Sequence, residues 1–95
     1  MARFIVEVVD QMDISDIESQ YTGGGSEGYP PKMLIALIFY AYASGIFSSR
    51  KIEKATYELI PAIFIAQGLH PDHSVISKFR KRFLKDLEVF FTKYY

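Results

Sequence analysis

Two histidines, His70 and His73, stand just before a run of basic residues in "GLHPDHSVISKFRKRF", residues 68–83. Imidazoles at this spacing could ligate a metal ion, but a zinc site normally has three or four protein ligands. The chain has no third histidine and no cysteine. The pattern instead favours a helix start, in which Pro71 sets the entry turn and the Asp72 side chain caps the helix. We therefore expect no metal site and no cofactor.

The segment after Asp72 predicts one long helix, near residues 72–93. At 100° per residue, its apolar side chains fall on a narrow stripe that would face the core: Ile76, Phe79, Phe83, Leu87, Phe90 and Tyr94. The opposite face collects Ser74, Lys78, Lys81, Arg82 and Lys85. A polyanion is the usual partner of such a positive surface. The alternative is that this face is only solvated.

The order of elements from Pro61 onward is that of a helix-turn-helix unit. A short helix over residues 62–67, a turn at Gly68 and a second helix would place the start of the basic helix in the major groove of DNA. Ser74 and Ser77, in its first two turns, would then lie nearest to the bases. Lys78, Lys81, Arg82 and Lys85 would hold phosphates.

A second basic cluster, Arg50 and Lys51, follows Ser48 and Ser49 at another predicted helix start. Hydroxyls, backbone amides and a guanidinium at such a place form a plausible phosphate clamp. An equally good interpretation is a capped helix whose charged face is simply solvated.

Features of an enzyme are missing. The N-terminal carboxylates lie in one amphipathic stretch and look like a solvated face rather than a buried acid–base pair; they belong to Asp10, Asp13, Asp16 and Glu18. The glycine-rich "TGGGSEG" lacks the strand and helix that flank a phosphate-binding loop. We expect no catalytic residues and no small-molecule ligand.

The elements that position these residues are all expected to be helical. A chain of 95 residues is enough for one domain, residues 1–95, and we predict an all-α fold of five or six helices with the helix-turn-helix-like unit in its C-terminal half. Residues 4–9 fit a strand as well as a helix, and we favour helix. Asp13 would cap a second short helix.

The segment near residues 32–46 should form a helix that is apolar almost all round. Its apolar run is too short to span a membrane, so we expect no membrane partner. Such a helix is either central in its own chain or shared with another protein, and the second possibility would make it the interface of a homodimer. With no signal peptide and no cysteine, the sequence is compatible with the cytoplasm.

Charge is divided unequally along the chain. Residues 1–31 contain one basic side chain, Arg3, and six acidic ones, whereas residues 32–95 contain ten basic and five acidic ones. The second part is therefore the expected binding end.

The sequence also resembles a known family, the N-terminal domain of DDE-class insertion-sequence transposases of the IS-four/five superfamily. The similarity runs from "RFIVEVVDQMDISDIESQY" through "YASGIFSSRKIEKA" to "HPDHSVISKFRKRF". It implies a helical domain that binds the double-stranded terminal inverted repeats of the element. It also implies that the catalytic residues lie in a separate domain beyond this chain. The chain departs from the family at Pro30-Pro31, often His-Pro, and at residues 61–65, often an aromatic or arginine-containing run.

Overall fold

The computed structural model describes residues 2–11, 29–83, 85, 87–89 and 92. Within these residues the chain forms five helices and no strand: α1 Ala2–Gln11, α3 Pro31–Ala43, α4 Ser49–Glu58, α5 Ile60–Ala66 and α6 His73–Arg82. The all-α prediction is confirmed, and the ambiguous residues 4–9 are helical. The predicted helix after Asp13 and most of the glycine-rich loop lie outside the described residues.

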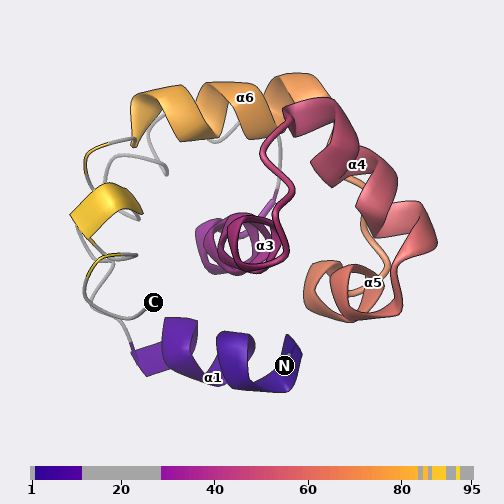
Figure 1. Cartoon of the computed structure of the whole chain (residues 1–95), viewed down its shortest axis with the longest axis horizontal. Helices are drawn as coiled ribbons and strands as arrows, with labels where there is room; N and C mark the ends of the chain where they lie inside the picture. Colours follow the sequence, from indigo (N-terminus) through magenta and orange to yellow (C-terminus); the bar gives the residue numbers. More distant parts are fainter. Residues whose placement is uncertain (1, 12–28, 84, 86, 90–91, 93–95) are drawn as a thin grey trace.

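Helix α3 lies at the centre, where Figure 1 looks along its axis and α1, α5, α4 and α6 surround it. Every side chain from residue 33 to residue 41 is buried. Because a helix turns through a full circle in 3.6 residues, this burial requires neighbours on all sides. The apolar helix therefore occupies the centre of its own chain. No helix in the described residues is both long and apolar enough to cross a bilayer.

Most helix ends follow local signals in the sequence. Pro31 is the first residue of α3, where a missing N–H costs nothing, and Gly45 ends that helix with a φ of 80°. The start of α6 follows the prediction, since the Asp72 side chain accepts a hydrogen bond from the Ser74 backbone N–H at 3.1 Å.

The boundary between α4 and α5 differs from the prediction. A break at Pro61 and a short helix over residues 62–67 were expected. The break instead falls at the extended residue Leu59, and α5 begins at Ile60. Proline is accepted in the first turn of a helix, so Pro61 is the second residue of α5. Leu59, the residue before this helix, makes the turn.

Helix α6 is shorter than the single helix predicted near residues 72–93. It ends at Arg82, and Phe83 has a non-helical backbone. Residues 87–89 form a separate helical piece, which Figure 1 shows turned away from the line of α6. The break lets Leu87 remain 2% exposed against the core.

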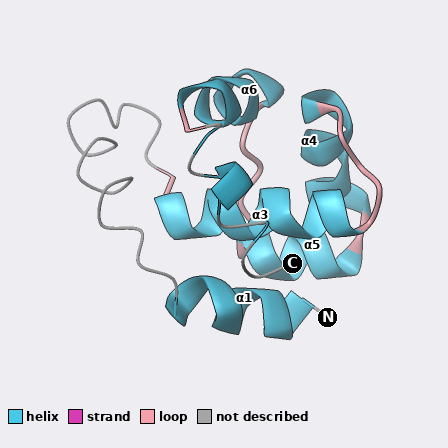
Figure 2. Cartoon of the chain, turned by 60° about the vertical axis from the view of Figure 1, so that its left-hand side comes forward, coloured by secondary structure: helices cyan, strands magenta, loops and turns pink. Residues whose placement is uncertain are grey.

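The buried stripe is confirmed for Ile76, Phe79, Phe83 and Leu87, whereas Phe90 and Tyr94 lie outside the described residues. The packing of the helix-turn-helix-like unit differs from the expected one. Helix α6 packs mainly on α4, while α5 packs on α4, α3 and α1. Figure 2 shows α4 beside α6 on the side away from α1. The main support of the basic helix is therefore α4 and not α5.

Candidate nucleic-acid interface

The turn between α5 and α6 is fastened to α4 by the two histidines. The ring of His70 stacks on Tyr57 with centroids 3.8 Å apart and planes at 4°. Its Nδ1 lies 3.1 Å from the Oγ1 of Thr56, a fully buried side chain. That hydroxyl donates its only hydrogen to the Glu53 carbonyl at 2.6 Å, so the His70 Nδ1–H is the donor of the other bond.

The second histidine is fixed at the start of α6. The Glu53 Oε1 accepts a hydrogen bond from the His73 backbone N–H at 3.1 Å and lies 3.1 Å from the His73 Nδ1. The side-chain and backbone hydrogen bonds of Ser74 hold the pKa of the Asp72 carboxyl below its usual value. Two carboxylates, those of Asp72 and Glu53, therefore lie at the positive end of the α6 dipole. The Glu53 contact also links this end of α6 to α4.

The predicted contact residues on α6 divide by exposure. Ser74, Lys78, Lys81 and Arg82 are exposed on the outer side of the helix, and Lys85 is exposed just beyond its end. Ser77 is partly buried. The Arg82 guanidinium lies 5.3 Å from the centroid of the Phe83 ring. Within α6, the exposed members of this set therefore lie on the side of the helix opposite the buried Ile76 and Phe79.

The second cluster lies beside the first. Arg50 and Lys51 are exposed in the first turn of α4, whose N-terminal end is next to α6 in Figure 1. Ser48 is the N-cap residue, but its side chain makes no capping hydrogen bond, contrary to the capped-start interpretation. The first amides of α4 are thus not capped by Ser48, and the positive end of the helix dipole adds to the neighbouring cationic side chains.

A surface hollow of about 280 Å³ lies between the start of α4 and α6, and Ser49, Ser77, Arg80 and Lys81 line it. Arg80 is held in place from two sides. Its Nη1 donates to the Ser49 Oγ at 3.0 Å, and its Nε donates to the Tyr42 hydroxyl at 3.0 Å. A guanidinium has five N–H donors in a rigid fork, so two such bonds orient it and leave capacity for an oxyanion.

Arg80 was not among the predicted contact residues. On a helical projection it falls between the apolar stripe and the outer face, where a basic residue carries no clear signal. Its partners Ser49 and Tyr42 lie 31 and 38 residues away in the sequence. Only the packing of α6 against α4 and the end of α3 brings these three side chains together.

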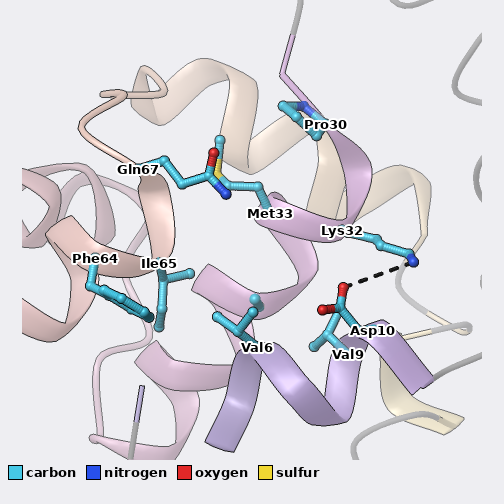
Figure 3. A pocket seen from close by; sticks show the side chains of 10 residues that line it. Val6, Val9, Asp10, Pro30, Lys32, Met33, Phe64, Ile65 and Gln67 are labelled. Carbon is cyan, nitrogen blue, oxygen red and sulfur yellow. Dashed lines mark ion pairs between the residues drawn. The ribbon is translucent and has the colours of Figure 1, made fainter. Parts of the chain in front are cut away.

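A larger hollow, of about 370 Å³, lies on the other side of the fold between α1, α3 and α5. Figure 3 shows its mainly apolar lining, with Val6, Met33 and Ile65 facing the space. The ion pair between Lys32 Nζ and Asp10 Oδ1, 3.9 Å apart, lies at its edge. This hollow has no excess of positive charge, so a polyanion is better matched by the smaller hollow.

The family model described as "Transposase domain (DUF772)" matches residues 1–82 of the chain. This region includes all of α1, α3, α4, α5 and α6. No curated protein and no solved structure shows a significant match to the chain.

Proposed function

Because the chain belongs to the transposase domain family DUF772, we propose that it serves as the DNA-binding module of a transposase. The observation that carries the proposal is the joined basic surface, in which the outer side of α6 and the start of α4 meet at the hollow around Arg80. We call this surface the α4/α6 basic face; its cationic members are Arg50, Lys51, Lys78, Arg80, Lys81, Arg82 and Lys85.

The hollow has the chemistry that a DNA phosphate requires. Two hydroxyls, a lysine and a preoriented guanidinium line it, and phosphates are bound by these groups and by helix N-termini. Arginine suits this role because its fork can donate two parallel hydrogen bonds to one phosphate. A phosphate in the hollow would contact α4 and α6 at once, and would thereby set the register of the domain on the duplex.

The other residues of the α4/α6 basic face are proposed to contact either phosphates or bases, according to their positions. Lys78, Arg82 and Lys85 would contact further phosphates along α6, whereas Lys81 and Ser77 line the hollow itself. Ser74, exposed in the first turn, lies where a short polar side chain can reach base edges when a helix start enters the major groove.

The target that fits the resemblance best is the duplex at the terminal inverted repeats of an insertion sequence. The same resemblance assigns cutting and joining of DNA to a separate DDE catalytic domain. On this proposal the 95 residues bind DNA and catalyse no reaction.

An assembly role is the second candidate, and the structure changes where such an interface would lie. Helix α3, the predicted homodimer surface, is buried from residue 33 to residue 41. Large apolar side chains are instead exposed at Ile60, Phe64 and Phe4, with exposures of 81%, 55% and 61%. A dimer that buries these three side chains would use the α1 and α5 side of the molecule, away from the α4/α6 basic face.

Fluorescence anisotropy with labelled duplexes at several salt concentrations tests the DNA-binding proposal. Replacing Lys78 and Lys81 together by alanine should lower the slope of log affinity against log salt by about 1.8, or 0.9 for each phosphate contact. This loss should be the same on element-end and scrambled duplexes. Arg3→Ala is the matched control, because Arg3 is exposed on α1 and its loss should leave the slope unchanged.

Replacing Ser74 by alanine tests the reading of bases separately. This variant should change the preference for the element end over scrambled DNA while it leaves the salt slope nearly intact. Equal binding by the parent and the double lysine variant would remove α6 from the interface. Sedimentation of the parent as a dimer without DNA would then favour the assembly role.

A further inference from the structure

Three potential metal ligands meet where the middle of α4 faces the start of α6. The His73 Nδ1 lies 3.1 Å from the Glu53 Oε1 and 3.4 Å from the Asp72 Oδ1. All three ligand atoms lie within 4.8 Å of one another. The sequence pairs His73 with His70, but the fold turns His70 toward Thr56 and Tyr57 and brings Glu53 in its place.

We propose that Glu53, Asp72 and His73 form a binding site for one divalent metal ion of the zinc type. The donor set is suitable because imidazole nitrogen and carboxylate oxygen are both zinc ligands. Three protein ligands leave a fourth tetrahedral position for a water molecule. Asp72 is 56% exposed and His73 is 34% exposed, so an ion and its water can reach the cluster from solvent.

The distances fit the geometry of such an ion. Zinc bonds of about 2.0–2.2 Å place neighbouring ligand atoms of a tetrahedron roughly 3.3–3.4 Å apart. The two distances from the His73 Nδ1 agree with this spacing within a few tenths of an ångström. A small rotation of the exposed Asp72 side chain would bring its oxygen toward Glu53. The ion would replace the hydrogen that now lies between the His73 Nδ1 and the carboxylates.

The charge of the cluster also favours a cation. Two carboxylates surround one imidazole, and the ion pairs of the described residues place no lysine or arginine against either of them. The nearest lysine in the sequence, Lys54, is paired with Glu58 instead, at 3.9 Å. The hydrogen bonds from Ser74 favour the ionised form of the Asp72 carboxylate, which is the form that ligates metal.

A bound ion would cross-link α4 to the first residue of α6. Ser74 follows His73 directly, so the ion would fix the end of α6 that carries the two serines of the α4/α6 basic face. The metal site does not depend on the DNA-binding proposal, because it is argued from ligand geometry and charge alone.

Calorimetry with Zn²⁺ and visible absorption with Co²⁺ as a spectroscopic probe test the site on the full chain. We expect one equivalent of Zn²⁺ per chain and a tetrahedral Co²⁺ band. Glu53→Gln, Asp72→Asn and His73→Asn should each weaken Zn²⁺ binding at least about tenfold, since loss of even an outer-shell partner of a metal site costs 10–100-fold. Asparagine at residue 72 keeps a good N-cap, so this variant separates ligation from helix capping.

Glu58→Gln is the matched control, because it removes one carboxylate of α4 that lies outside the cluster and is exposed. It should bind Zn²⁺ like the parent. Amide NMR shifts of the parent on Zn²⁺ addition should centre on Glu53, Asp72 and His73, and this readout does not require any variant to fold. No saturable binding by the parent, or parent-like Zn²⁺ binding by His73→Asn, would overturn the proposal.

Discussion

Replacing Phe83 by alanine should strongly weaken the packing of α6 against the rest of the domain. Phe83 is 1% exposed and is the largest of the fully buried side chains among the described residues. Its ring lies 4.9 Å from that of Phe79, centroid to centroid, in a tilted arrangement that favours the pair. It is also the C-cap residue of α6, where the backbone leaves the helical conformation.

The expected cost follows from the buried area. A phenylalanine side chain buries about 150–250 Å², and at about 25 cal/mol per Å² this area is worth roughly 4–6 kcal/mol. Measured Phe→Ala changes in protein cores cost about 3–5 kcal/mol, and we adopt that range. A domain of this size has a total stability on the order of 5–15 kcal/mol. Phe83→Ala should therefore remove a large part of the free energy of unfolding.

Thermal and urea unfolding followed by circular dichroism measure this effect. For a domain of about 100 residues each kcal/mol lowers the melting temperature by roughly 4–8 °C, so we expect a decrease of about 12 °C or more. Phe4→Ala is the matched control, because Phe4 is 61% exposed and its loss should change stability by no more than about 0.5 kcal/mol. A Phe83→Ala variant that melts within about 4 °C of the parent would refute the placement of this side chain in the core.

Three further substitutions probe single contacts. Thr56→Val keeps the shape of a fully buried side chain but removes its bonds to the Glu53 carbonyl and His70, and should cost about 1 kcal/mol in urea unfolding. Gly68→Ala places a side chain at a φ of 79° with no atom within 4 Å of its Cβ, so backbone strain alone should cost about 1 kcal/mol in melting experiments. Arg80→Gln should cost roughly 1–3 kcal/mol and weaken DNA binding on every sequence; unchanged DNA affinity would exclude a phosphate in the hollow.

Local sequence was sufficient to predict much of the fold. Pro31 and Gly45 mark the two ends of α3, and Asp72 marks the start of α6, because prolines, glycines and cap residues act on their nearest backbone neighbours. The apolar stripe through Ile76 and Phe79 was also correct, since helical period alone decides which side chains share a face. The same helical period also places the lysines of α6 together on its outer side.

The sequence did not predict the interface features that depend on residues far apart in the chain. Arg80 has no signal of its own, and its role in the hollow arises from Ser49 and Tyr42, which only the packing of three helices brings to it. The straight helix expected beyond Arg82 was wrong. Its local apolar period is compatible with a continuous helix, but the helix ends at Phe83, whose backbone is non-helical and whose side chain is buried.

The two histidines illustrate the same division. Their residue types determine what they can bind, and the structure places the Nδ1 atoms of the two rings against different partners. Which atoms they meet was decided by α4, which places Thr56 against His70 and Glu53 against His73. Cap and turn preferences are local free energies, set by a few neighbouring residues. Partners 14 and 20 residues away come together only when burial of the whole core fixes how the helices pack.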